Sequence, residues 1–221
     1  MPIRERISLL LLNLGVVVGR QGNDLYAEEL YREGLTLARK IGHYERISLL
    51  LLNLGDVVME QDRDMEALVC YEEGLALARK LGHRNYISDL QLHLGVLATK
   101  QGEVERAENY LREGLLLAYQ LGHPQLICKG LAAWGELHLQ RYELQKAERA
   151  FMQMLKLMPE GCRVLEAHAQ YGLARIAASR GSLYQAKYLA EQCGATFESL
   201  GHRKKGTVYA FLADLPLDPI R

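Results

Sequence analysis

Apolar residues recur along the chain with the spacing of α-helices, and the whole pattern returns every 40 residues. The segment RISLLLLNLG at residues 6–15 is repeated without change at residues 46–55. Within one period, a first stretch is apolar at almost every position from Arg6 to Val18, and a second has apolar residues at i, i+3, i+4 and i+7 from Ala27 to Ala38. Self-similarity at a period of about 20–50 residues indicates a solenoid. Each period predicts two helices, the first buried on several sides and the second on one face.

Start and stop signals bound the second helix of each period. Asp24 is a good N-cap, Arg39 and Lys40 match the dipole in the last turn, and Gly42 supplies a left-handed residue that ends the helix. His43 follows that glycine and is predicted to contact the last carbonyls or to start the next helix. The same place in later repeats is taken by His83, His123 and His202. Equivalent residues of successive repeats lie about 8–10 Å apart, which is too far for these histidines to share one zinc ion.

Glycines placed inside the predicted helices indicate close helix packing. The first helices of four repeats contain Gly15, Gly55, Gly95 and Gly135. Glycine inside a helix costs about 1 kcal/mol relative to alanine, so a periodic one needs a structural reason. We expect it to face an alanine of the partner helix, at Ala27, Ala67, Ala107 and Ala147. A second series is predicted to contact the next repeat, at Gly34, Gly74 and Gly114.

These signals predict an all-α protein, a right-handed α-solenoid of antiparallel helix pairs with about five repeats and one terminal helix in a single array. The fourth copy has residues 158–161 in place of the Gly-His turn, and the fifth has Ala174 in place of the glycine inside the first helix. The repeats are expected at residues 4–43, 44–83, 84–123, 124–161 and 162–202, and the terminal helix at 203–214.

Composition limits the class of protein. The chain has 27 basic and 27 acidic residues, so its net charge offers no argument for nucleic acid or an anionic membrane. The start, MPIRERIS, carries charges before any apolar run and is unlike a signal peptide. The run Leu9–Leu12 is too short to span a bilayer. The four cysteines are far apart among apolar helical residues, where a free thiol behaves as a small hydrophobe. We therefore expect a cytoplasmic protein with neither nucleic-acid nor membrane partners.

The repeat resembles a known family. Leu14 and Gly15, followed by Ala27 and then Tyr31, form a pattern similar to the tetratricopeptide repeat. The fourth copy shows it again as Trp134, Gly135, Ala147 and Phe151. The 40-residue period and the ARKxGH turn resemble the long-helix branch of that family. That branch is found in kinesin light chains, in spindle-orientation adaptors and in the C-terminal arms of bacterial signalling ATPases and transcriptional activators. The resemblance covers nearly the whole chain and implies the solenoid fold, whereas a scaffold of this kind implies little about function.

The resemblance also implies where a partner would bind. First helices of the family line a concave groove, and an Asn at the position of Asn13 and Asn53 hydrogen-bonds the backbone of an extended peptide. A structural hydrogen bond between repeats is the alternative for these two residues. The other predicted groove residues are Leu9, Leu12, Val16, Leu49, Leu52, Asp56, Asp89, Leu92, Val96, Lys129 and Glu136. This surface lacks the cluster of Lys and Arg expected for a carboxylate or phosphate, and an amphipathic helix or an apolar extended peptide suits it better.

The ends of the predicted array carry apolar residues without a polar cap. Leu10 lies in the first helix, and Val208, Tyr209, Phe211 and Leu212 lie in the terminal one. Solenoids need polar terminal repeats for solubility. Two explanations remain open, and they are compatible. The chain is a fragment of a longer array, or these residues form an interface between copies.

The pattern as a whole predicts a non-enzymatic scaffold that binds a peptide or a helix of a partner protein. One alternative is a ligand-sensing regulatory arm of a larger bacterial signal-transduction ATPase or transcriptional activator. A second is a module that self-assembles through its ends. We expect no catalysis, cofactor or metal, because the sequence lacks a phosphate loop, GxSxG, HExxH and paired CxxC motifs. Asp56 and Asp89 are the only candidates for hydrolytic chemistry, and solvated groove charge accounts for them equally well.

Overall fold

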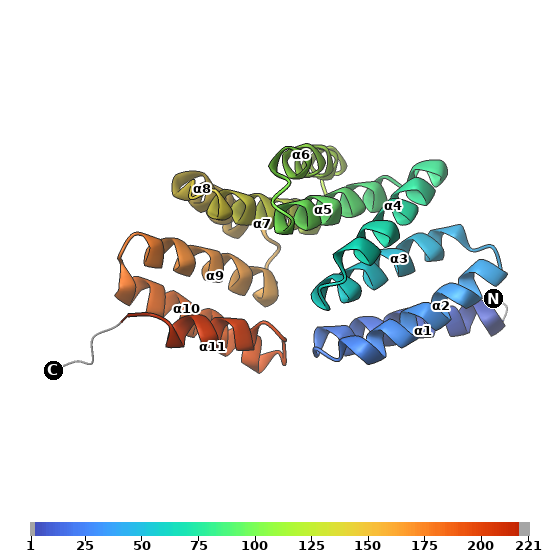
Figure 1. The fold of residues 1–221 in the computed structure, drawn as a ribbon, viewed down its shortest axis with the longest axis horizontal. Coiled ribbons are helices and arrows are strands. Elements are labelled where there is room, and N and C mark those ends of the chain that lie inside the picture. The colour runs from blue at the N-terminus through green and yellow to red at the C-terminus, as the bar shows by residue number, and fades with distance from the viewer. Residues whose placement is uncertain (1–2, 217–221) are drawn as a thin grey trace. The chain divides into compact units, whose positions relative to one another are not determined.

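The computed structural model describes residues 3–216, which form eleven α-helices and contain no strand (Figure 1). Within this range no helix combines the length and the apolar character that a bilayer crossing requires. The all-α architecture of repeated helix pairs is thus confirmed. The helices are α1 (Ile3–Arg20), α2 (Asp24–Lys40), α3 (Tyr44–Glu60), α4 (Asp64–Leu81), α5 (Arg84–Lys100), α6 (Val104–Leu121), α7 (Pro124–Gln140), α8 (Leu144–Leu157), α9 (Arg163–Ser179), α10 (Leu183–Ser199) and α11 (Lys205–Ala213).

The chain divides into two compact units. Unit 1, Met1–Leu121, holds the pairs α1–α2, α3–α4 and α5–α6, and unit 2, Gly122–Arg221, holds α7–α8, α9–α10 and then α11. Within unit 1, each second helix packs on the next first helix, since α2 contacts α3 and α4 contacts α5. Within unit 2, α8 contacts α9 and α10 contacts α11 in the same way. The expectation of one continuous array stays a prediction.

The turns between helices follow the predicted signals with one correction. Asn23, not Asp24, caps α2, and its side chain accepts a hydrogen bond from the backbone N–H of Tyr26. Asparagine and aspartate are both good N-caps, so the sequence does not show which of these two adjacent residues takes the N-cap position. Gly42 is left-handed, with φ +69°. His43 caps α3, and its Nδ1 accepts a hydrogen bond from the backbone N–H of Arg46 at 3.3 Å.

Three of the four predicted glycines inside the first helices, Gly15, Gly55 and Gly135, face an aromatic ring, and Gly95 faces Leu111, which corrects the prediction that they face an alanine. A Cβ added to Gly15 would lie 2.4 Å from Cε1 of Tyr31, and one added to Gly55 would lie 2.4 Å from Cε1 of Tyr71. Ala27, on the same helix as Tyr31, lies near Gly19 instead. A Cβ added to Gly19 would be 3.6 Å from Cβ of Ala27. The absent side chain therefore provides the space for a buried ring.

A buried serine in each repeat of unit 1 joins the two helices of its pair. Ser8 Oγ donates to the carbonyl of Gly34 at 3.0 Å, and Ser48 Oγ donates in the same way to Gly74 at 2.9 Å. Because a serine so deeply buried would lose free energy without a partner, this bond explains a polar residue in an otherwise apolar run.

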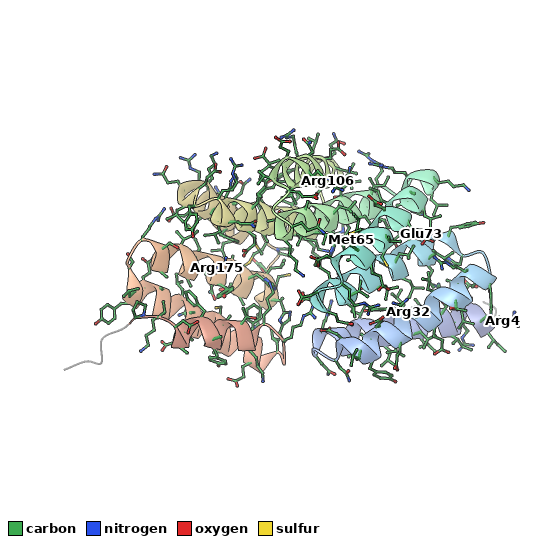
Figure 2. The ribbon with its side chains drawn as sticks, viewed as in Figure 1. Arg4, Arg32, Met65, Glu73, Arg106 and Arg175 are labelled. Carbon is green, nitrogen blue, oxygen red and sulfur yellow. The ribbon has the colours of Figure 1, made fainter. Side chains whose placement is uncertain are left out.

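Ion pairs also join neighbouring second helices. Arg32 on α2 pairs with Glu66 on α4, and Arg39 donates to Glu73 at 2.6 Å (Figure 2). Burial alone would raise the pKa of Glu28, but hydrogen bonds from Arg63, Arg32 and Gln61 outweigh it and lower that pKa to about 2. These contacts link the second helices of the first two repeats.

The buried cysteines behave as small apolar side chains. Burial raises the pKa of Cys70 and of Cys193 to about 11, so both thiols stay protonated near neutral pH. Cys128 is also buried, and burial raises its pKa as well. A protonated thiol is a weak nucleophile, which agrees with a packing role.

His168 on α9 faces the start of α11. Its Nδ1 lies 3.3 Å from Nζ of Lys204, and its ring centroid lies 5.2 Å from that of Phe197 and 5.8 Å from that of His202. Burial, followed by the charges of Lys204 and His202, holds the pKa of His168 well below its usual value. The imidazole is therefore neutral in the folded protein.

Acid is expected to weaken this contact. The unfolded chain takes up the proton of His168 at about pH 6.5, before the folded chain does, so stability present above that pH is lost as the pH falls. Uptake of one proton changes the free energy of unfolding by at most about 1.4 kcal/mol per pH unit. Urea unfolding at about pH 7.5 and pH 5.5 measures this difference. His168→Gln should reduce this difference. Equal pH dependence in the wild type and in His168→Gln would contradict the assignment.

Candidate functional site

The exposed side of the first helices in unit 1 forms a surface that we call the first-helix surface. Its helices are neighbours, because α1 contacts α3 and α3 contacts α5. Each helix contributes residues at i, i+4 and i+7, which share one helix face. The residues are Leu9, Asn13 and Val16 on α1, Leu49, Asn53 and Asp56 on α3, and Asp89, His93 and Val96 on α5, and all are partly or fully exposed.

Three leucines predicted to face the groove lie in the core instead. Leu12, Leu52 and Leu92 are 4, 5 and 0 % exposed. A Cβ added to Gly114 would lie 2.9 Å from Cδ2 of Leu92, so this side chain packs against α6. In a run of four leucines every helix face is apolar, and the sequence cannot show which of them turns inward. These three side chains are therefore not part of the first-helix surface.

The two asparagines have different surroundings. Asn53 Nδ2 donates to the carbonyl of Leu49 at 2.7 Å, within its own helix. This is a local bond, and it does not run between repeats. Asn13, at the equivalent position in α1, is exposed. A role of either amide in binding a peptide backbone stays a prediction.

A histidine lies between two carboxylates at the centre of the α3–α5 part of this surface. His93 Nδ1 is 2.6 Å from Oδ1 of Asp56 on α3, and His93 Nε2 is 3.4 Å from Oδ1 of Asp89, one turn earlier on α5. The three side chains remain partly open to solvent, with 13, 33 and 20 % exposure for His93, Asp56 and Asp89. We call these three residues the acidic cluster.

Tyr71 on α4 contacts two members of the acidic cluster, Asp56 and His93. Its hydroxyl donates to Oδ1 of Asp56 at 2.6 Å, and its ring centroid lies 5.4 Å from that of His93. Burial, followed by the charge and hydrogen bond of Asp56, holds the pKa of Tyr71 well above its usual value. The hydroxyl therefore stays protonated and orients the carboxylate.

The acidic cluster combines two carboxyl groups with one imidazole ring. Two carboxylates face one ring, and a neutral imidazole donates one hydrogen bond while an imidazolium donates two. Each carboxylate oxygen can accept more than one hydrogen bond, so a cationic group can bind here in addition to the partners that these residues already have. Among residues 3–216, no three His, Cys, Asp or Glu side chains are arranged to hold a metal ion.

The remaining groove candidates belong to unit 2. Glu136 on α7 is exposed and accepts a hydrogen bond at 2.6 Å from Nη1 of Arg175, which lies on α9 (Figure 2). Lys129, also on α7, is partly buried. Here Glu136 links two first helices of unit 2, and a role of either residue in a groove stays a prediction.

The terminal helix α11 covers α10. Val208 is fully buried, and a Cβ added to Gly194 would lie 3.4 Å from its Cγ1, so Val208 is not part of an end interface as predicted. Tyr209 donates its hydroxyl to Glu198 at 2.9 Å. Phe211 packs on a ring of α9, and Leu212 is partly buried. Leu10, at the other end, is 65 % exposed.

Two members of this site, His93 and Tyr71, were not predicted from the sequence. His93 stands where the earlier repeats have asparagine, and it lies four residues after Asp89, on the same helix face. That spacing was a usable signal for one of its two contacts. Tyr71 follows the repeat pattern like any core aromatic, so its hydroxyl gave no separate signal.

Comparison with known proteins gives a consistent result. Residues 45–118 match the family model described as tetratricopeptide repeat. No curated protein matches the sequence at a significant level.

Three solved structures with similar folds illustrate the likeness. BtubC (BKLC) from P. vanneervenii aligns with TM-score 0.65 and 18 % identity, over 98 % of this chain and 86 % of its own. Rap protein complexed with Competence and Sporulation Factor aligns with TM-score 0.72 and 15 % identity, over 97 % of this chain and 65 % of its own. A Podosopora anserina putative kinesin light chain with nearly identical TPR-like repeats aligns with TM-score 0.60 and 18 % identity, over 90 % and 98 %.

The repeated helix pairs define a helical-repeat solenoid protein, a class whose members typically mediate protein–protein interaction. The match shows the tetratricopeptide repeat over residues 45–118, and the solved structures show the same helical-repeat fold over nearly all of the chain. The resemblance noted in its sequence is therefore confirmed.

Proposed function

We propose that the first-helix surface binds a segment of a partner protein, and that the acidic cluster receives a cationic side chain of that segment. The observation that carries this proposal is the placement of Asp56 and Asp89 on opposite sides of His93, at 2.6 and 3.4 Å, on a partly exposed surface. A lysine or arginine supplies the hydrogen-bond donors that two carboxylates accept.

Apolar side chains beside the cluster indicate the rest of the ligand. Leu9, Val16 and Leu49 are partly exposed and pack against the core of unit 1. A segment with apolar residues and a central Lys or Arg would bury these side chains and place its charge at the cluster.

The comparisons support the class of partner. Proteins of this superfamily typically bind proteins or peptides, and the Rap structure is described as a complex with Competence and Sporulation Factor. A scaffold and a ligand-sensing arm would both bind their ligand at this surface. The chemistry of the ligand is therefore the feature to test first.

Short fluorescent peptides that differ only at a central Lys, Arg, Leu or Glu within an apolar sequence provide the test. We expect the Lys and Arg peptides to bind most tightly. The double variant Asp56→Asn and Asp89→Asn should weaken their binding by about tenfold or more, and added salt should weaken the wild-type complex. Fluorescence anisotropy measures each affinity.

A matched variant controls for net charge. Glu29→Gln with Glu105→Gln removes the same number of charges from exposed positions of second helices, and it should bind like the wild type. Asn at position 56 still accepts from Tyr71, so the fold should be retained, which circular dichroism checks. Equal binding of Lys and Glu peptides, or full binding by the Asp variant, would refute the proposal.

A further inference from the structure

The outer face of α1 carries an exposed apolar stripe, which we call the end stripe. Its members are Ile3, Ile7, Leu10, Leu14 and Val17, all of them exposed. They are spaced by four and three residues in turn, which is the seam spacing of packed helices. This stripe is a different face from the first-helix surface.

The same sequence is buried in the next repeat. Residues 6–15 and 46–55 are identical, yet Leu10 is 65 % exposed and its equivalent Leu50 is 0 % exposed. Leu14 and Leu54 differ in the same way, at 44 and 2 %. The difference comes from what lies on the helix, because the helix itself is unchanged.

The structure shows what kind of element covers this sequence. Helix α2 lies on α3, and a Cβ added to Gly34 would be only 3.1 Å from Cδ2 of Leu50, so the covering helix needs a small residue there. At the other end of the contact, Gln61 Nε2 donates to Oε2 of Glu28 at 2.9 Å, near the start of α2. The covering helix runs antiparallel, since a short turn joins it to α3.

Charges beside the end stripe favour the same arrangement. Arg4 and Arg6 are exposed at the start of α1, as Figure 2 shows for Arg4, and Arg20 is exposed at its end, followed by Gln21. An antiparallel helix would place its negative C-terminal dipole beside Arg4 and Arg6. An acidic residue in its first turn would meet Arg20 and Gln21.

We propose that the end stripe docks an antiparallel amphipathic helix of another protein, one with the chemistry of this chain's own second helices. That helix carries Gly or Ala opposite Leu10, apolar neighbours on the same face, and an acidic residue in its first turn. The contact adds one more helix layer to unit 1 and is independent of the ligand proposed for the first-helix surface.

A labelled peptide with the sequence of residues 24–40, held helical by a side-chain link on its solvent face, provides the probe. We expect saturable binding to the whole protein in fluorescence anisotropy. Leu10→Asp should weaken it by at least about tenfold, because the contact buries a leucine. Leu10 is exposed, so this variant should keep the wild-type helicity.

The matched control is Met65→Asp, which makes the same change from an exposed apolar side chain to aspartate on α4, away from the end stripe. It should leave the affinity for this peptide unchanged. Absence of binding, or binding that Leu10→Asp leaves intact, would overturn the proposal. A concentration-dependent dimer of the wild type that Leu10→Asp abolishes would also overturn it, since the occupant would then be a second copy. Because the probe and the face differ, failure here leaves the acidic-cluster experiment unaffected.

Discussion

Replacing Tyr71 with alanine is expected to lower the free energy of unfolding by about 3–5 kcal/mol. The side chain is fully buried, and its ring occupies the space left by Gly55 and lies against His93. Removing it leaves a cavity between α3 and α4 that two packed helices cannot close completely. Urea unfolding followed by circular dichroism measures the loss.

Tyr71→Phe separates the ring from the hydroxyl. Phenylalanine keeps the packing but removes the hydrogen bond to Asp56, so we expect a loss of only about 0.5–1.5 kcal/mol. If alanine were no more destabilising than phenylalanine, the ring would not be the element that holds α3 and α4 together. The phenylalanine variant should also loosen the acidic cluster, which the binding of Lys-centred peptides would report.

The repeat made the helices and turns predictable, but it could not assign every contact. Helix bounds followed from polar turns and left-handed glycines such as Gly42, which act within a few residues. The partner of Gly15 was different, because both Ala27 and Tyr31 recur with the same period and only the packed structure shows which one faces the glycine. Periodicity identifies equivalent positions without saying which of them touch.

The candidate site was predictable only in part for a related reason. Asp56 and Asp89 were recognisable as charges on first helices. They lie on helices of different repeats, α3 and α5, and His93 contacts both of them. Such a cluster depends on how neighbouring repeats stack, which a single sequence does not define. The division after Leu121 was hidden as well, since Gly122 and His123 reproduce the turn of the preceding repeats.

Gly55→Ala is expected to destabilise the protein by about 2–3 kcal/mol. Its Cβ would lie 2.4 Å from Cε1 of Tyr71, so either the buried ring or one of the two helices must move. Alanine gains about 1 kcal/mol in helix propensity, which offsets only part of this cost. Urea unfolding again gives the difference in free energy.

Two further substitutions test whether steric contact causes the loss. Gly19→Ala adds the same methyl group at 3.6 Å from Cβ of Ala27, an ordinary contact, and should leave stability unchanged or slightly higher. Gly15→Ala meets Tyr31 at the same 2.4 Å, but α1 has an exposed outer face and can shift away from α2. Its cost should therefore lie between the other two, because the penalty depends on how far the surroundings can relax. Equal effects at Gly19 and Gly55 would mean that backbone entropy, and not the aromatic ring, determines the choice of glycine.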